Sequence, residues 1–318
     1  MQRIFVDGQH GTTGLEIHRL LQPRGDVTLV TLDEAQRRDP AARRACLNDA
    51  DAVVLCLPDD AAIDAVAMIE SPEVRVLDAS TAHRVDPGWQ YGMPELNGRR
   101  ACLHGARRVS NPGCFATGFL CAVEPLLRAG LIPTDLPLSA HAVSGYSGGG
   151  RQMIEKFQSR ARAAENPDQL FHAQAYALGL AHKHLPEMLM YSGTATTPLF
   201  TPSVGHFYRG MLVNVPLFAK QLHTGASAAE VVRIWRDAYE GEPCVQVFDV
   251  GAATALDAGY LDPQAANFTN RVELMVFGNA DRLLLVARLD NLGKGAAGAA
   301  VQNLNLMLGL PEFAGIAP

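Results

Sequence analysis

The stretch Arg3-Ile-Phe-Val-Asp7-Gly8-Gln-His-Gly11-Thr-Thr-Gly14-Leu-Glu-Ile-His-Arg-Leu-Leu21 decides the fold of the first part of the chain. It reads as a short strand, a glycine-rich turn and a helix in direct succession. Glycines let the backbone approach a phosphate closely, and a helix N-terminus offers free N–H groups to it. An ordinary strand-to-helix turn has the same order of elements and stays open as the alternative. The expected phosphate contacts are Gly8, Gly11, Thr12, Thr13 and Gly14.

The rest of the first hundred residues continues the alternation of strands and helices. Apolar runs at 26–32, 52–57 and 74–79 predict strands, and 40–50 and 59–69 predict helices, the second of them capped by Asp59 or Asp60. The run Ala52-Val-Val-Leu-Cys-Leu57 suits a strand that is buried on both faces. The pattern predicts an α/β fold in which a doubly wound parallel sheet carries helices on both sides.

Residue types after the second expected strand leave the choice of nicotinamide cofactor open. Asp33 ends that strand, where an acidic residue binds the ribose hydroxyls of NAD. Four arginines follow, and arginine accommodates the extra phosphate of NADP. The same four residues could instead form a solvated helix face. They are Arg37, Arg38, Arg43 and Arg44.

Length and composition set outer limits. A chain of 318 residues exceeds the size at which one core usually stops growing, so we expect two domains. A net charge of −6 argues against a nucleic-acid partner. The six cysteines form no C-x-x-C pair and show no zinc spacing, which predicts reduced thiols, a cytoplasmic location and no metal site. We expect no signal peptide, because the N-terminus enters a strand at once, and no membrane partner, because no apolar stretch reaches membrane-spanning length.

A second informative stretch is Ser110-Asn-Pro-Gly-Cys114. Pro112-Gly113 is a turn signal, and the run from Phe115 to Arg128 has helical apolar spacing. Cys114 is therefore expected at the start of a helix, where free N–H groups and a partial positive charge favour a nucleophilic thiolate. A small buried cysteine at a helix start is the alternative.

The second half of the chain is richer in strands. We expect strands at 139–144, 209–218 and 244–250, a hairpin formed by 271–277 and 282–289, and one intervening helix at 226–239. The glycine-rich segment from Gly145 to Arg151 reads as a flexible loop able to wrap an anion. These elements predict a mostly antiparallel α+β domain. A last helix at 295–308 could return to pack on the first domain.

Two histidines stand together in His182-Lys-His184-Leu-Pro-Glu187. Histidine can act as a general base near neutral pH and can activate a thiol. A metal pair is the alternative, but no third ligand has suitable spacing, and a purely structural histidine also stays open.

Taken together, these motifs resemble the N-acetyl-γ-glutamyl-phosphate reductase family in its shorter form, which is related to aspartate-semialdehyde dehydrogenase. The resemblance covers nearly the whole chain, and the S-N-P-G-C and H-K-H-L-P-E segments are its most specific parts. One departure is His10, in a turn where longer forms often carry Ala-Ser. Further matching segments are Asp78-Ala-Ser80-Thr-Ala-His-Arg84, Tyr91-Gly-Met-Pro-Glu95, Val143-Ser-Gly145, Arg209-Gly210 and Asp290-Asn291-Leu-Gly-Lys294.

The resemblance implies a domain plan and a chemistry. Residues 1–113, completed by a C-terminal helix at 291–318, would form an NADP-binding Rossmann domain, and 114–290 a catalytic and oligomerisation domain of a dimer or tetramer. Cys114 would attack the acyl phosphate of the substrate, the resulting thioester would be reduced with NADPH, and His184 would be the base. The resemblance further suggests substrate contacts at His182, Tyr176, Arg84, Arg151 and Ser144, and cofactor contacts at Ser80 and Asn291.

Two other functions stay open. The first is a related acyl-phosphate reductase that acts on aspartyl phosphate or on a longer homologue. The second is a protein that senses NADP(H) without turnover, which would not depend on Cys114.

Overall fold

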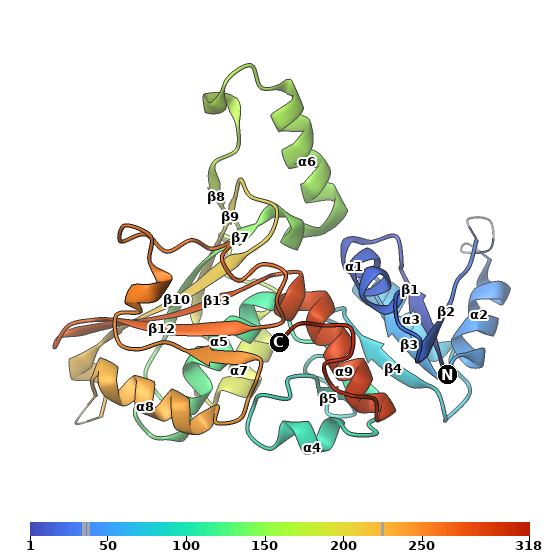
Figure 1. Cartoon of the computed structure of the whole chain (residues 1–318), viewed down its shortest axis with the longest axis horizontal. Helices are drawn as coiled ribbons and strands as arrows, with labels where there is room; N and C mark the ends of the chain where they lie inside the picture. Colours follow the sequence, from blue (N-terminus) through green and yellow to red (C-terminus); the bar gives the residue numbers. More distant parts are fainter. Residues whose placement is uncertain (34–35, 37–38, 224–225) are drawn as a thin grey trace. The chain divides into compact units, whose positions relative to one another are not determined.

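The computed structural model describes residues 1–33, 36, 39–223 and 226–318, and it divides into two compact units (Figure 1). Unit 1 comprises Met1–Pro112 and Ala296–Ala317, and unit 2 comprises Gly113–Gly295 and Pro318. The expected residues Arg37 and Arg38 lie outside the described part of the chain.

Unit 1 is built on a parallel sheet with strand order β2-β1-β3-β4-β6-β5, and all pairings between these described strands are parallel. The predicted doubly wound fold is confirmed. Its elements are β1 (Gln2–Asp7), α1 (Thr12–Leu21), β2 (Val27–Val30), α2 (Pro40–Asp49), β3 (Ala52–Leu55), α3 (Asp59–Ala67), β4 (Arg75–Asp78), β5 (Gln90–Tyr91), α4 (Arg99–Leu103), β6 (Arg108–Ser110) and α9 (Gly298–Leu308).

Helices cover both faces of this sheet. One face packs Ile4, Val6 and Val54 against Ile17 of α1 and Leu304 of α9. The other face packs apolar strand residues against α2 and α3. The fully buried strand β3 explains why residues 52–55 are apolar without alternation.

Unit 2 carries a mixed sheet with strand order β11-β12-β13-β10-β7-β9-β8. Four of its described pairings are antiparallel, whereas β7–β9 and β11–β12 are parallel, so the mostly antiparallel α+β prediction is confirmed. Its helices are α5 (Cys114–Arg128), α6 (Gly150–Ala163), α7 (Leu185–Ser192) and α8 (Ala228–Ala238). Its strands are β7 (Ser139–Gly145), β8 (Ala173–Ala175), β9 (Leu199–Gly205), β10 (Met211–Phe218), β11 (Val245–Val247), β12 (Val272–Gly278) and β13 (Arg282–Leu289).

Helix α5 is the core of unit 2. It packs against β10 and β13, and against α7 and α8. Most of its residues are buried, and Trp235 of α8 donates a hydrogen bond from Nε1 to the carbonyl of Ala122 at 2.9 Å. The helix that presents Cys114 is thus held along its whole length.

The prediction of a flexible loop from Gly145 to Arg151 is wrong. The short 3₁₀ turn η2 (Tyr146–Gly149) follows β7 directly and leads into α6, which projects from the unit in Figure 1. The Tyr146 ring stacks on Phe157 of α6 with centroids 5.0 Å apart. This packing, which the local glycine pattern does not show, orders the segment. Helices α6 and α7 were not predicted, whereas α5 and α8 were.

Other boundaries also differ from the sequence predictions. Pro58 is the N-cap of α3, because Asp59 instead accepts a hydrogen bond from the backbone N–H of Thr81 at 2.8 Å. The expected strand 244–250 shortens to β11. The last helix begins with a π-helical turn, η6 (Gly293–Ala297), before α9.

Gly118 offers a test of the α5 packing. A Cβ at this position would lie 2.8 Å from Cγ2 of Val213 on β10, closer than real Cβ contacts. We expect Gly118→Ala to lower the free energy of unfolding by about 1–2 kcal/mol, since overpacking outweighs the gain of about 1 kcal/mol in helix propensity. Urea unfolding followed by circular dichroism measures the change.

Gly25→Ala is the matched control, because a Cβ at position 25 would meet no atom within 4 Å. A Gly118→Ala protein as stable as the parent would contradict the packing argument.

Candidate active site

Cys114 is the first residue of α5, as the turn signal predicted. Its N-cap, Gly113, has extended backbone angles and no side chain that could cap the helix, and the first turn carries no acidic residue. The N–H groups and positive partial charge of the helix N-terminus are therefore available to the thiol, which is partly exposed. A helix start of this kind stabilises a thiolate.

An aromatic cluster joins this helix start to the histidine segment. The ring of Phe115, next to Cys114, lies 5.5 Å from the His182 ring and 5.7 Å from the His184 ring, measured between centroids. The two imidazoles meet edge to face at 4.7 Å. The structure thus brings Cys114 and both histidines, predicted separately from sequence, into one cluster within unit 2.

The two imidazoles differ in their hydrogen bonding. The backbone N–H of His184 donates to Nδ1 of His182 at 3.1 Å. This bond requires an unprotonated Nδ1, so a neutral His182 carries its proton on Nε2 and is a donor there. His184 is the buried N-cap of α7. Of the two rings, His184 is the better candidate for accepting a proton.

Tyr176 lies on the other side of His182, with ring centroids 5.9 Å apart. Burial, and secondly the negative charge of a Cys114 thiolate, raise the pKa of Tyr176. The phenol is therefore protonated throughout the neutral range and can donate a hydrogen bond to a ligand.

Two contacts at Cys114 were not predicted from sequence. Glu187, in the first turn of α7, accepts a hydrogen bond at Oε2 from the backbone N–H of Gly113 at 3.0 Å. Gly295 in η6 lies so close that a Cβ there would be 2.7 Å from Cβ of Cys114. Glu187 belongs to the quoted histidine motif and Gly295 begins the expected last helix, but only the tertiary packing brings them next to Gly113 and Cys114.

Unit 2 also contains a second group of polar side chains, most of them buried. Nε of Arg209 donates to Oδ1 of Asp290 at 3.1 Å, and the guanidinium covers the ring of Phe268. The amide of Asn291 accepts from the N–H of Gly210 at 2.8 Å and donates to Oγ of Ser147 at 2.9 Å. Asn291, expected to contact the cofactor, thus ties η2 to the start of β10.

The two remaining predicted side chains of unit 2 have different surroundings. Ser144 is buried at the end of β7 and donates to the carbonyl of Gly145 at 3.2 Å. Arg151 is exposed on α6 and forms an ion pair with Glu155 one helical turn away, at 2.8 Å. An exposed ion pair of this kind accounts for Arg151 without any role in ligand binding.

The glycine-rich turn of unit 1 has the geometry of a phosphate cradle. Gly8 has a φ of +88°, and a Cβ on it would lie 2.3 Å from the carbonyl oxygen of Cys56. A Cβ on Gly14 would lie 2.4 Å from the carbonyl oxygen of Gly8. Gly11, the N-cap of α1, makes no side-chain capping bond, and the first turn has no acidic residue. The turn therefore fits an anion at the N-terminus of α1.

A second turn of unit 1 follows β4 and contains Ser80 and Arg84. The buried carboxylate of Asp78 accepts hydrogen bonds from Oγ of Ser80 and from Nδ1 of His83, both at 2.7 Å. The ring of His83 stacks on Trp89. Ser80 thus shapes this turn with its hydroxyl, and Arg84 is buried beside it.

Three of the residues that were expected to decide between NAD and NADP form contacts within the protein. Asp33 accepts the N–H of Gln36 at 2.7 Å. Arg43 is bound to Asp7 at 2.6 Å, where burial raises the pKa of the carboxyl and the arginine offsets part of that rise. Arg44 pairs with Glu70.

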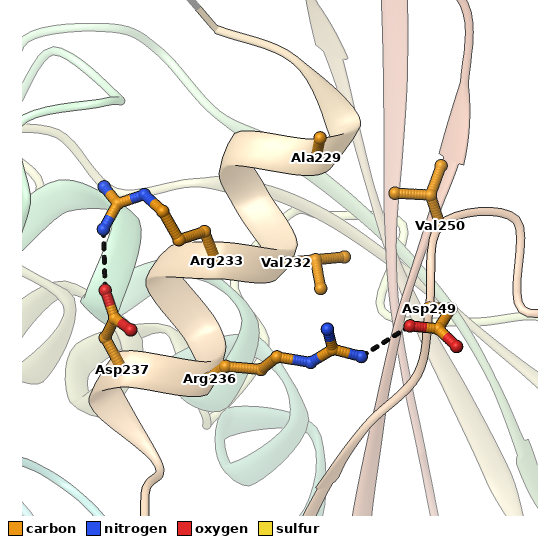
Figure 2. A pocket seen from close by; sticks show the side chains of 7 residues that line it. All are labelled: Ala229, Val232, Arg233, Arg236, Asp237, Asp249 and Val250. Atoms are coloured by element: carbon orange, nitrogen blue, oxygen red, sulfur yellow. Dashed lines mark hydrogen bonds and ion pairs between the residues drawn. The ribbon is translucent and has the colours of Figure 1, made fainter.

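A surface pocket of about 300 Å³ on α8 is separate from this cluster (Figure 2). Arg233 and Arg236 are among the residues that line it, and they form ion pairs with Asp237 and Asp249 at 2.7 and 2.6 Å. Among the residues that the structure describes, no group of three His, Cys, Asp or Glu side chains could hold a metal ion. Within the same residues, no helix combines the length and apolar character needed to cross a membrane.

Comparison with known proteins identifies the family. Residues 3–104 match the semialdehyde dehydrogenase NAD binding domain, and residues 114–291 match the semialdehyde dehydrogenase dimerisation domain. Among solved structures, aspartate semialdehyde dehydrogenase II from Vibrio cholerae complexed with ASA has a TM-score of 0.71 at 16% identity, covering 97% of this chain and 98% of that one. The enzyme from Candida albicans with NADP has a TM-score of 0.65 at 13% identity, covering 97% and 99%. These likenesses show the fold.

Curated relatives are much closer in sequence. N-acetyl-gamma-glutamyl-phosphate reductase 2 of Nostoc sp. is 48% identical over 318 residues, which cover 99% of each chain. The protein of the same name from Pseudomonas putida is 48% identical over 309 residues, or 96% of each chain. The chain therefore belongs to the N-acetyl-gamma-glutamyl-phosphate reductase family.

Proposed function

We propose that the protein reduces N-acetyl-L-glutamyl 5-phosphate to N-acetyl-L-glutamate 5-semialdehyde and phosphate through a thioester on Cys114, as a step of arginine biosynthesis. The names of its relatives supply the substrate. The observation that carries the chemistry is the cluster in which Phe115 holds the rings of His182 and His184 at the N-terminus of α5.

Each side chain of the cluster has a role in this mechanism. Cys114 attacks the carbonyl carbon of the acyl phosphate, the C–O bond to phosphate breaks, and inorganic phosphate leaves. His184 takes the thiol proton, because Nδ1 of His182 is already engaged by a backbone N–H. His182 and Tyr176 bind substrate as hydrogen-bond donors, and the N–H groups at the start of α5 stabilise the oxyanion.

A nicotinamide cofactor fits the turn from Gly8 to Gly14. Gly8, Gly11, Thr12, Thr13 and Gly14 would hold its pyrophosphate, and Ser80 would shape the neighbouring turn. When bound, NADPH would supply the hydride that reduces the thioester. We propose NADP(H) over NAD(H), on the basis of the family resemblance and of Arg37 and Arg38 after the second strand.

The remaining assignments of the proposal concern substrate anions and assembly. Arg84 and Arg151 are its candidates for the carboxylate or phosphate, because guanidinium binds both groups in bidentate fashion. Ser144 is a further substrate contact and Asn291 a cofactor contact. The match to a dimerisation domain supports a homo-oligomer. A cytoplasmic location is proposed from the six cysteines, whose pattern predicts reduced thiols.

The direct test is an assay of NADP⁺ reduction with N-acetylglutamate 5-semialdehyde that depends on added phosphate. Aspartate semialdehyde and the semialdehyde one methylene longer form the comparison panel. A preference for either of these would replace the substrate assignment with the related acyl-phosphate reductase. Binding of NADPH without turnover on any of them would favour the sensing function.

The nucleophile is tested by Cys114→Ser. The volume hardly changes, so fold and NADPH binding should persist, whereas kcat should fall by about 10³-fold or more because an alcohol is a poorer nucleophile at neutral pH. Steady-state kinetics measure the loss. Retention of more than about a tenth of kcat would contradict the covalent mechanism.

The two histidines are tested by the pH profile of Cys114 alkylation with iodoacetamide. A thiolate–imidazolium pair keeps the thiol reactive well below pH 8, so the profile of His184→Gln should move toward that of a free thiol. His182→Gln should shift the profile much less and should mainly raise KM. The opposite ranking would exchange the two roles.

A Cys102→Ser background sharpens this measurement. Cys102 is the exposed thiol that competes for the reagent, whereas Cys121 and Cys244 are buried. Burial, with the charges of Asp78 and Asp7, raises the pKa of Cys56 to about 12 and keeps that thiol unreactive.

The phosphate cradle is tested at Gly11. A Cβ there would lie 3.3 Å from the carbonyl oxygen of Gly8 and 3.9 Å from that of Cys56, so a side chain requires a shift of a few tenths of an ångström, far less than at Gly8 or Gly14. Gly11→Val should raise the Kd for NADPH at least about tenfold by blocking the pyrophosphate, and Gly25→Val is the matched control. Fluorescence titration with NADPH, and then with NADH, measures both affinity and preference. Unchanged NADPH affinity would remove the cofactor from this turn.

A further inference from the structure

We propose that Glu187 is a positioning residue that sets the nucleophile and its base relative to each other. The inference deepens the proposed function, since it concerns the reactivity of Cys114. Its basis is a single carboxylate that joins two helix starts: Glu187 belongs to the first turn of α7, and its Oε2 accepts the N–H of Gly113, the N-cap of α5.

The residues bound in this way are the immediate neighbours of the reacting groups. Gly113 precedes Cys114, and the carbonyl of Gly113 is held as well, because it accepts bonds from the backbone N–H and Oγ1 of Thr117 at 2.8 and 3.1 Å. His184 is the N-cap of the helix that carries Glu187. Glu187 therefore fixes the peptide group that precedes Cys114, and it does so from the same helix start that carries His184.

Because the hydrogen bond between Glu187 and Gly113 is buried, its loss is costly. Glu187 is only 1% exposed, so water cannot replace it as the acceptor for Gly113. A buried N–H left without an acceptor is costly, so the start of α5 would shift to find another. Gly295 restricts such a shift, because it already lies against Cβ of Cys114. A displaced helix start would therefore change the approach of Cys114 to His184.

The surroundings also explain how a carboxylate is tolerated beside a thiolate. It lies at the N-terminal ends of two helices, where the free N–H groups favour negative charge. The titratable side chains of the same cluster are Cys114, His182, His184 and Tyr176, and Lys294 is buried in η6 next to Gly295. Glu187 acts through Gly113 and α7 rather than on the substrate.

The test compares Glu187→Ala with Glu187→Gln in the Cys102→Ser background. Gln keeps an oxygen acceptor for Gly113, whereas Ala removes it. For Glu187→Ala we expect kcat to fall about 30-fold or more, with substrate KM within about threefold, and the iodoacetamide pH profile of Cys114 to move toward a free thiol. Glu187→Gln should restore kcat to within about fivefold of the parent.

Glu230→Ala is the matched control. Glu230 occupies the third position of α8, as Glu187 does in α7, but it is paired with Arg233 at the surface. This variant should leave both kcat and the alkylation profile unchanged.

Three outcomes would overturn the proposal: kcat of Glu187→Ala within about threefold of the parent; equal losses in Ala and Gln; or a lower Tm with an unchanged alkylation profile of the folded protein. Because alkylation requires no substrate, the alkylation profile tests the role of Glu187 even if the substrate assignment fails.

Discussion

The N-terminus of α5 is the constraint on which the arrangement of unit 2 depends. A helix start whose N-cap is a glycine leaves its N–H groups to be satisfied from outside the helix. Here the N–H of Gly113 is bound by Glu187, a side chain from another helix. The buried body of the helix, packed on β10 and β13 with Gly118 against Val213, keeps this end in place.

Much of the fold was predictable because it follows local rules. The strand, turn and helix from residue 3 to 21 and the start of α5 at Cys114 depend on glycine, proline and apolar spacing, which the sequence displays directly. The parallel sheet of unit 1 follows from the alternation of elements. The segment after Gly145 was mispredicted because glycine content alone suggests flexibility, whereas stacking of Tyr146 on Phe157 orders it.

The site was predictable only as separate parts. Cys114, His182, His184 and Tyr176 carry recognisable chemistry, but their association depends on Phe115 and on the packing of α5 against α7. Glu187 and Gly295 have roles defined by long-range contacts, whereas Asp78 acts on Ser80 and His83 in the turn that follows its own strand. No periodicity in the sequence shows that a carboxylate will meet the N–H of Gly113, or that a serine hydroxyl will be used by an aspartate of the preceding strand.

The glycines of the glycine-rich turn are required for two different reasons, the packing of the protein's own backbone and the approach of a ligand. Gly8 and Gly14 are fixed by the protein's own backbone, since any side chain on them would collide with a carbonyl oxygen. A Cβ on Gly11 would meet the carbonyl oxygen of Gly8 at 3.3 Å, a close contact that a small local shift could relieve. The scaffold therefore dictates the first and last glycine whatever is bound, whereas the middle one is the position of the three at which a side chain would disturb the backbone least.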